Sequence, residues 1–471
     1  MKSLTLYEKV AHEISHLIES GTFRPGDRIP SVRKLSRQLK VSISTVMEAY
    51  RLLEDQGLVE CRPQSGYYVI SSPADKQPEI AVSQPSTKPT KVSINDLVMM
   101  VFKANRNPNL IQLGAAIPNP ELLPADKINR SLSSVTRRYR LRNIEYEFVP
   151  GCMELRVQIA RRALTTGCTV TPDDIVITAG CQEAIMLALK VICKPGDTIA
   201  VESPTYYNFL QAIEMLGLKA LEIPTHPRDG INLDTLRYAI EHNPIKACLF
   251  ITNFNNPLGS CMPDDRKKEL VEMLSEYDIP LIEDDIYGDI AYSYHRPKIA
   301  KAFDKNEIAL LCSSFSKTIA PGYRVGWIIP GRYKQEVERL KSITNLATAT
   351  PIQLAIADFL SNGGYDHHLR KIRSIYARNI SMMSEAVMKY FPEGTKVSRP
   401  SGGHVLWIEM PEDIDSLDLY EKALKKKISF APGPIFSSRR RYRNFLRFNA
   451  ATWNEDIKTA VKTIGTLADR L

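Results

Sequence analysis

The chain has 471 residues, about three times the length of an average domain of ~150 residues, so we expect two or three domains. Hydrophobic residues make up 44% and charged residues 24% of the chain, which excludes a wholly disordered or fibrous protein. The formal net charge of +9 permits an anionic partner but identifies none. The eight cysteines form no C-x-x-C pair, and the sequence shows neither a secretion signal nor an apolar run of about 18 residues. We therefore expect a cytoplasmic protein with reduced thiols and no membrane partner.

A proline-rich stretch divides the chain. Residues 73–92 contain four prolines, no aromatic residue and no helical or strand period, a composition typical of a linker. This predicts a head of residues 1–72 and a body of residues 93–471.

The head has the pattern of three short helices followed by a β-hairpin. Apolar residues recur at helical spacing, Ser31 is placed to cap the second helix, and Gly57 ends the third. Two short strands follow at 58–61 and 67–70. This order of elements is the winged helix-turn-helix plan of DNA-binding domains. Between Arg28 and Arg51 there are six basic residues and one acidic residue, although such charge alone would equally fit a solvated helical hairpin.

The residues of the head point to a particular family. The strings R-P-G-D-R-I-P-S at 24–31 and V-S-I-S-T-V at 41–46, with Gly57 after them, resemble the GntR family of DNA-binding domains. The resemblance covers residues 4–70. It implies DNA contacts by Arg33, Ser42, Ser44 and Thr45, with Gln64, Ser65 and Gly66 at the tip of the wing. Ile43 departs from the family, which often has arginine there, so we expect base recognition at that place to be different or weaker.

A second motif in the head points elsewhere. Residues 12–16 read H-E-I-S-H, the zinc-binding pattern of metalloproteases. The rest of the head fits another plan and supplies no third ligand on a second helix. We interpret the match as an exposed helix face and expect no metal site.

The body alternates short apolar runs with helical stretches. The runs lie at 175–178, 199–201, 248–251, 281–282 and 310–312. This alternation predicts an α/β domain with a mostly parallel sheet. From about residue 370 the pattern changes to long helices and a strand pair around 403–408, which predicts a smaller α+β subdomain at 370–471.

Several of these runs end in residues that suit an aldehyde cofactor bearing a phosphate. Lys317 follows one run and offers an amine for a Schiff base, while Arg324 and nearby serines offer donors to a phosphate. Asp284 ends another run, where a carboxylate could keep a pyridinium nitrogen protonated. Further candidates are Asn256 and Tyr287 for a ring hydroxyl, Tyr206 for the ring face, and Gly180, Cys181 and Gln182, at a helix N-terminus, for the phosphate.

Each of these signals is weak alone, but their order and spacing resemble fold-type I, aspartate aminotransferase-like enzymes over residues 95–471. With the head, the chain resembles MocR-type regulators, in which a GntR domain precedes an aminotransferase-like domain. The resemblance implies pyridoxal 5'-phosphate (PLP) as cofactor. It assigns Lys317 to the Schiff base, Asp284 to the pyridine nitrogen, Asn256 and Tyr287 to the ring hydroxyl, Tyr206 to stacking, and Gly180, Cys181, Gln182, Ser314, Ser316 and Arg324 to the phosphate.

The resemblance also concerns substrate and assembly. Arg447 and Gly114 match residues that hold a substrate carboxylate, for which a bidentate guanidinium is suited. Tyr146 matches a tyrosine that reaches the phosphate of the neighbouring subunit, which implies a homodimer with shared sites. We interpret the basic run Arg439, Arg440 and Arg441 as solvated or facing DNA.

The sequence thus predicts a winged helix-turn-helix domain joined to an α/β fold-type I PLP-dependent transferase. We expect a transcriptional regulator that binds double-stranded operator DNA and responds to an amino acid or to PLP. The alternative is a metabolic aminotransferase with an accessory DNA-binding domain, because every residue that transamination needs is present. Whether the protein is an enzyme stays open, as do its effector and its operator.

Overall fold

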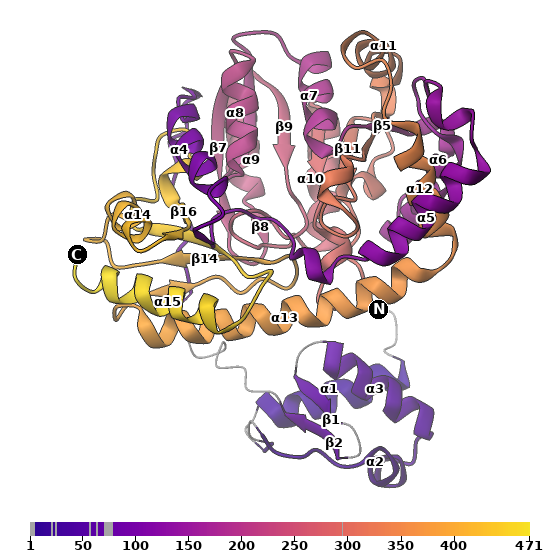
Figure 1. The fold of residues 1–471 in the computed structure, drawn as a ribbon. Coiled ribbons are helices and arrows are strands. Elements are labelled where there is room, and N and C mark those ends of the chain that lie inside the picture. Colours follow the sequence, from indigo (N-terminus) through magenta and orange to yellow (C-terminus); the bar gives the residue numbers. More distant parts are fainter. Residues whose placement is uncertain are drawn as a thin grey trace.

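The computed structural model describes residues 5–19, 22–23, 26–55, 58–62, 65–69, 79–293 and 295–471. The head, drawn in indigo in Figure 1, contains three helices and one hairpin in these ranges. Its elements are α1 (Leu6–Glu19), α2 (Val32–Leu39), α3 (Ile43–Asp55), β1 (Val59–Arg62) and β2 (Gly66–Val69).

The head is a winged helix-turn-helix, as the sequence predicts. Val10 and Ile14 of α1 pack with Leu35 of α2 and with Val46 and Leu53 of α3 in one small core. Ser31 caps α2, because its Oγ accepts a hydrogen bond at 3.4 Å from a backbone N–H in the first turn of that helix. The hairpin pairs β1 and β2 antiparallel.

The body is built on a nine-stranded mixed sheet, ordered β3-β7-β6-β9-β10-β11-β12-β5 with β8 beside β7. Six strands run in one direction, and β3, β8 and β12 run against them. The prediction of a mostly parallel sheet is confirmed. The strands are β3 (Thr90–Lys91), β5 (Val176–Thr178), β6 (Thr198–Ser203), β7 (Lys219–His226), β8 (Gly230–Ile231), β9 (Ile245–Phe250), β10 (Leu281–Asp284), β11 (Ala309–Ser314) and β12 (Gly326–Ile329).

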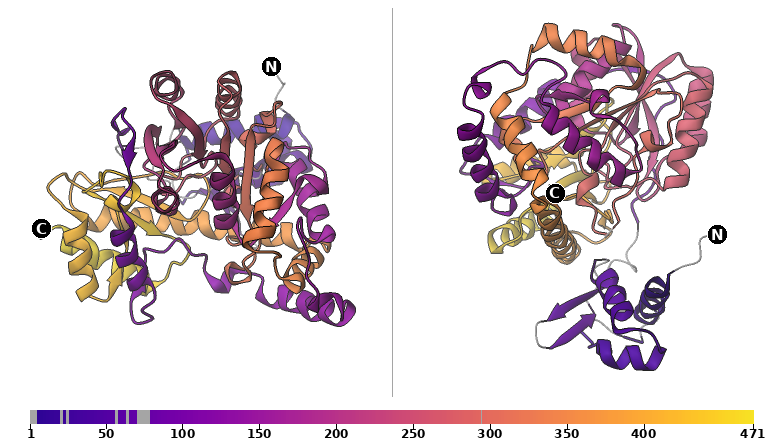
Figure 2. Two further views of the ribbon diagram at one scale, coloured as in Figure 1. Left: turned by 90° about the horizontal axis from the view of Figure 1, so that it is seen from above. Right: turned by 90° about the vertical axis from the view of Figure 1, so that its right-hand side faces the viewer.

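Helices cover both faces of this sheet (Figure 2). Along β11, Leu310 and Cys312 enter the core cluster that contains α7 and α8, whereas Ala309 and Leu311 enter clusters on the other face. Burial on both faces explains why the strands read as continuous apolar runs. One face carries α7 (Cys181–Ile192), α8 (Tyr207–Met215) and α11 (Lys334–Thr344), and the other carries α5 (Ala125–Arg138), α6 (Met153–Ala163), α9 (Leu233–His242), α10 (Asp264–Glu276) and α12 (Thr350–Ser361).

A second, four-stranded sheet forms the smaller part of the body. Its order is β13-β14-β17-β16, and all three pairs are antiparallel. In Figure 1 the long helix α13 runs beneath both sheets. The elements are α13 (Gly364–Tyr390), β13 (Lys396–Val397), β14 (Val405–Glu409), α14 (Ser416–Lys425), β15 (Ile428–Ser429), β16 (Ala431–Pro432), β17 (Phe445–Asn449) and α15 (Glu455–Ala468).

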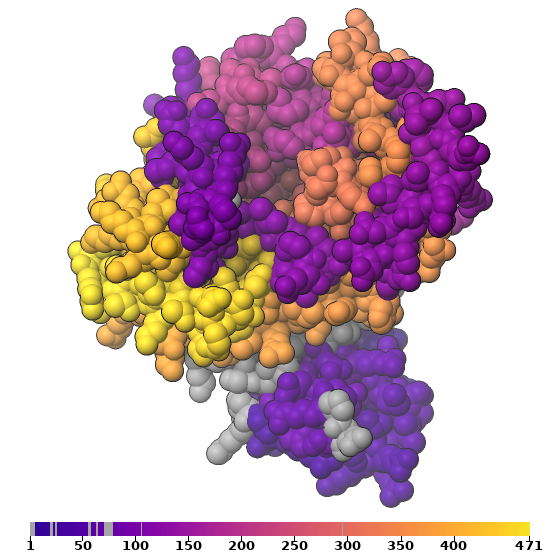
Figure 3. Space-filling view, viewed as in Figure 1, coloured from indigo at the N-terminus to yellow at the C-terminus, as the bar shows by residue number. Residues whose placement is uncertain are grey.

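The start of the body joins this C-terminal part. Strand β4 (Ile111–Gln112) pairs in parallel with β15, and α4 (Asn95–Asn105) packs beside the same strand. Figure 3 shows the purple surface around residue 100 next to the yellow C-terminal surface. The pairing joins segments more than 300 residues apart, so local sequence patterns carry no sign of it.

The proline-rich stretch differs from a free linker in its second half. Ile80 and Val92 are buried, and β3 pairs antiparallel with the edge strand β7. Proline excludes a helix but is compatible with an extended segment at a sheet edge, so the same composition that indicated a linker also permits docking. We call residues 79–93 the arm.

Candidate functional site

The predicted cofactor residues lie at the carboxyl ends of the parallel strands. Asp284 ends β10, Ser314 ends β11, and the turn after β5 leads into α7. Such ends meet at one edge of the sheet and open a crevice there, which is where ligands bind in open α/β sheets. Local strand-turn-helix units therefore bring these residues together.

Lys317 extends from the turn after β11 into this crevice. Its Nζ donates to the carbonyl oxygen of Ala116 at 2.6 Å and lies 5.6 Å from the ring centre of Tyr287. Burial lowers the pKa of Lys317 to about 8, and the nearby positive charge of Arg447 acts in the same direction. The amine is therefore more often neutral near pH 8 than an ordinary lysine, as a nucleophile toward an aldehyde must be.

Asp284 is buried and receives two hydrogen bonds on one oxygen. Its Oδ1 accepts from the thiol of Cys181 at 3.2 Å and from the backbone N–H of Ile286 at 3.1 Å. Burial raises the pKa of Asp284 to about 7, against the opposing effect of the Cys181 hydrogen bond. This carboxylate has no ion-pair partner among the described residues, and a protonated ring nitrogen would supply one, so the residue fits the pyridine role.

The predicted phosphate residues form a cluster of donors at the start of α7. Gly180 is the residue before the helix, with φ +90°, and a side chain there would collide with the guanidinium of Arg324. Arg324 donates to Ser316 Oγ at 3.3 Å and to the carbonyl oxygen of Ala179 at 3.2 Å. A helix N-terminus with an adjacent arginine and serines suits a phosphate dianion.

Three other predicted phosphate residues have more limited contacts. Ser314 Oγ accepts from the backbone N–H of Ser316 at 3.3 Å. The thiol of Cys181 is directed at Asp284, so this residue can offer the phosphate its backbone N–H only. Gln182 lies half-buried in the first turn of α7.

Arg447 is fully buried in the middle of β17 and contacts two other predicted residues. It donates to Asn256 Oδ1 at 2.8 Å and to the carbonyl oxygen of Gly114. Its Nε has no hydrogen-bond partner among the described residues. A side chain at Gly114 would collide with the backbone of Phe430. The backbone at residue 114 can therefore lie this close to Phe430 only because the residue is glycine.

Two of the predicted aromatic residues, Tyr206 and Tyr146, lie in different surroundings. Tyr206 packs at the start of α8, with its ring centre 4.8 Å from that of Tyr207. Burial raises the pKa of Tyr206, and the nearby charges of Arg447 and Asp284 also act on this pKa. The side chain of Tyr146 is 69% exposed beside Phe148, away from the other predicted residues of its own chain.

Two further groups at the site have no local pattern by which they could be predicted. The segment 114–117 covers the crevice, because its carbonyl oxygens accept hydrogen bonds from Arg447, Lys317 and Asn449. His404 is also buried there, with Nδ1 2.8 Å from Asn449 Oδ1 and its ring against Tyr287. Burial lowers the pKa of His404 to about 3, with Lys317 adding to the effect. Both contacts depend on residues distant in sequence.

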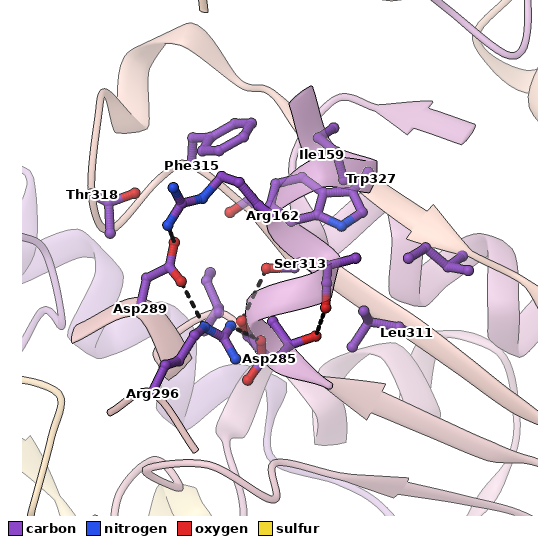
Figure 4. Close-up of a pocket in the computed structure, with 15 residues that line it drawn as sticks. Ile159, Arg162, Asp285, Asp289, Arg296, Leu311, Ser313, Phe315, Thr318 and Trp327 are labelled. Carbon is purple, nitrogen blue, oxygen red and sulfur yellow. Dashed lines mark hydrogen bonds and ion pairs between the residues drawn. The ribbon is translucent and has the colours of Figure 1, made fainter. Parts of the chain in front are cut away.

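A small cavity of about 40 Å³ lies beside the turn after β10, and Figure 4 shows its lining. Arg296 pairs with Asp285 and, at 2.6 Å, with Asp289, which also pairs with Arg162 at 3.5 Å. The two arginines lower the pKa of Asp289, against the effect of its burial. Because the charges satisfy one another and Asp284 does not line the cavity, we regard it as packing that supports the turn after β10.

The predicted DNA-binding residues lie on α2, at the start of α3 and in the wing. Arg33, Ser42 and Ser44 are exposed, and Ser42 Oγ also caps α3 by accepting from the backbone N–H of Thr45 at 3.0 Å. Ile43 is exposed on the same helix.

In the wing, Ser65 Oγ lies 2.6 Å from the hydroxyl oxygen of Tyr68, and Gly66 has φ +116°. Gln64 lies outside the described residues. The DNA contacts themselves stay predictions.

The described ranges hold neither a candidate metal site nor a candidate membrane span. They contain no group of three or more His, Cys, Asp or Glu side chains placed to hold a metal ion, and His12 and His16 are exposed on α1. None of their helices is long and apolar enough to cross a membrane.

Comparison with known proteins agrees with the two-part organisation. The chain matches the family model for aminotransferase class I and II over residues 143–464, and that for bacterial regulatory proteins, gntR family, over residues 6–69. It is 40% identical over 462 residues to the HTH-type transcriptional regulator YdcR of Escherichia coli, covering 98% of both chains.

Two aminotransferases match the larger part of the chain. Aromatic-amino-acid aminotransferase 1 of Thermococcus litoralis is 31% identical over 356 residues, covering 74% of this chain and 85% of that one. The crystal structure of Pyrococcus horikoshii kynurenine aminotransferase superimposes with a TM-score of 0.74 at 30% identity, covering 80% of this chain and 94% of that one.

Proposed function

Because the chain belongs to the HTH-type transcriptional regulators of MocR-type architecture, which join a GntR head to a class I and II aminotransferase domain, we propose that it binds operator DNA under the control of PLP and an amino acid. Class I and II aminotransferase domains are typically PLP-dependent. When bound, PLP supplies an aldehyde and an electron-accepting pyridinium ring. Lys317, Asp284 and the donors at the start of α7 are the residues that would hold these groups.

The state of Arg447 carries the proposal for an amino-acid effector. Its guanidinium is fully buried, has no carboxylate partner among the described residues, and leaves Nε without a hydrogen bond. A buried positive charge is costly unless it is paired, and a guanidinium fits a carboxylate in a bidentate manner. A ligand carboxylate placed beside Lys317 would supply that partner.

An exposed apolar surface supports a homodimer. Ile144, Tyr146 and Phe148 are all strongly exposed, and Phe148 bridges to the segment that carries Ile343 and Leu346, which are exposed as well. Monomeric proteins rarely leave such patches open to water. A second subunit on this patch would cover it and would bring Tyr146 to a neighbouring site.

Transamination is the second candidate activity. The lowered pKa of Lys317 prepares the amine to exchange protons near neutral pH, as transamination requires. Aromatic-amino-acid aminotransferase 1 of Thermococcus litoralis shares this body at 31% identity. Regulation is favoured as the main role because the head, which aminotransferase chemistry does not need, is retained.

The test is a titration of the upstream intergenic DNA with the PLP-loaded protein, with and without a panel of amino acids. We expect at least one amino acid to change the affinity of the wild-type protein for DNA, and Arg447→Ala to abolish that change. Lys317→Ala should lose the Schiff-base absorbance and, with it, any response to PLP. If Arg447→Ala responds as the wild type does, the effector is not held by Arg447. Turnover of the same amino acids with a keto acid would favour the aminotransferase alternative.

A further inference from the structure

Three consecutive arginines bond the arm to the body. Arg439 donates to Thr90 Oγ1 at 2.7 Å and to the carbonyl oxygen of Lys88 at 3.2 Å. Arg440 donates to the carbonyl oxygen of Ser93 at 3.1 Å. Arg439 and Arg440 are exposed, as a solvated run would be, but they also bond the arm, which the sequence did not predict. We call residues 437–443 the Arg loop.

Backbone carbonyls, rather than acidic side chains, are the main partners of these arginines. Arg441 completes the set by donating to the carbonyl oxygen of Gln84 at 2.5 Å, and no ion pair of the three is found in the described ranges. The next arginine, Arg443, instead pairs with Asp415 within the small part of the body. Bonds to carbonyls depend on the path of the arm and not on its side chains, so the contact recognises an extended conformation.

A second set of bonds connects the arm, the Arg loop and the crevice. Ser83 Oγ donates to the carbonyl oxygen of Ser203 at 3.0 Å, and Ser203 Oγ lies 2.7 Å from the hydroxyl oxygen of Tyr442. The buried carboxylate of Glu222 accepts from Ser203 and from Ser437. Because Ser203 ends β6, three residues before Tyr206, the arm is bonded to the rim of the predicted cofactor site.

The Arg loop leads directly to Arg447. It follows Phe436, whose ring centre lies 5.2 Å from the guanidinium carbon of Arg447, and only Asn444 separates it from β17. Arg440 and Tyr442 have φ of +54° and +62°, a left-handed conformation that is uncommon outside glycine. Such a conformation persists only where the surroundings hold it, and it occurs often at switches. Movement of β17 would therefore be transmitted to the loop.

We infer that the Arg loop couples the ligand state of Arg447 to the arm, and that the arm carries this signal toward the DNA-binding head. The inference rests on the proposed function. A carboxylate on Arg447 competes with Asn256 and Gly114 for the guanidinium, which changes the position of β17. The Arg loop then holds the arm in one state and releases it in the other, which changes the reach of the chain segment that bears the head.

The first test is hydrogen exchange of the full-length protein, read at the amides of residues 86–93. The probes are PLP alone and PLP with L-alanine, L-glutamate or L-tyrosine. We expect exchange in the arm to change when the wild type is loaded. The triple variant Arg439→Ala, Arg440→Ala, Arg441→Ala should exchange at least about tenfold faster there in every state, whereas the control Arg443→Ala should behave as the wild type. An arm whose exchange is unaffected by every probe, or by the triple variant, overturns the inference.

The second test separates coupling from direct contact with DNA. The triple variant should bind PLP normally and bind DNA, while the ratio of DNA affinities with and without ligand falls toward one. Replacing the same three residues with lysine keeps the charge but not the forked donor geometry, so we expect little recovery. If the alanine variant instead loses DNA affinity equally in all states, with a salt slope lower by about three, and lysine restores it, the run faces DNA and the inference fails. A wild type without Schiff-base absorbance or DNA binding would refute the proposed function itself.

Discussion

Arg447 donates to Asn256 Oδ1 at 2.8 Å, although the two residues are 191 positions apart. The pair joins the expected carboxylate-binding residue to the expected ring-hydroxyl residue. A ligand carboxylate must therefore compete with protein acceptors for the guanidinium, and Asn256 is freed to turn when it does. Binding of a ligand carboxylate to Arg447 and binding of the cofactor's ring hydroxyl to Asn256 are linked through this bond. Such a link suits a protein whose ligand must change its conformation.

The rate at which the apoprotein captures PLP should depend on pH through Lys317. Only the neutral amine attacks an aldehyde, and the pKa of Lys317 is lowered to about 8 by burial and by Arg447. We expect the rate to rise about tenfold per pH unit below 8 and to level off above it. Stopped-flow absorbance measures this. Arg447→Leu should shift the midpoint to higher pH, whereas Arg443→Leu should not, and an unshifted midpoint would show that Arg447 does not act on the amine.

Asp284→Asn should stabilise the apoprotein while weakening PLP binding. Burial raises the pKa of Asp284 from 3.8 to about 7, so the folded state keeps a proton that the unfolded state loses as pH rises from 4 to 7. The ionised carboxylate then costs up to about 4 kcal/mol above pH 7, from a shift of about three units. Thermal unfolding of the apoprotein should show a higher midpoint for Asp284→Asn at pH 8 and no difference at pH 4. Equal midpoints at pH 8 would contradict the raised pKa.

Gly180→Ala should weaken binding of the cofactor phosphate. The substitution places a side chain against the Arg324 guanidinium at a residue with φ +90°. Displacing this guanidinium from the phosphate removes a charge-assisted hydrogen bond worth about 1.5–3 kcal/mol, which corresponds to roughly a tenfold loss of affinity or more. PLP titrations measure it, and pyridoxal, which has no phosphate, should lose much less. Gly322→Ala is the matched control, because open space surrounds that glycine. A similar loss in both variants would mean that the effect is general.

A chain of residues 79–471 should fold and bind PLP but should no longer shift DNA. The anchors of the arm on the body begin at Glu79, which pairs with Arg228 at 2.5 Å, so the cut leaves them intact. Gel shifts and Schiff-base absorbance are the measurements. Sequence-specific binding by residues 79–471 would place the DNA reader in the body.

In the full-length chain, Arg33→Ala should weaken DNA binding. If Arg33 contacts phosphate only, the substitution should also reduce the slope of DNA affinity against salt concentration by about one.

The sequence by itself determined the parts of this protein that are local. The head is recognisable because caps, turns and apolar spacing act over a few residues. Lys317 and Asp284 are recognisable as site residues because Lys317 follows one buried strand and Asp284 ends another. Parallel strands place their carboxyl ends at one edge, so the nearness of these residues follows from the class of fold.

The tertiary structure alone decided which distant segments complete the site. Ala116 lies 201 residues from Lys317, and Arg439 lies about 350 residues from the arm that it bonds. Neither contact has a local pattern, because a carbonyl oxygen is present at every residue and a basic run looks the same whether it faces water, DNA or its own backbone. Packing of the small sheet against the large one brings these donors and acceptors within reach, and that packing is set by the whole core rather than by the residues that meet.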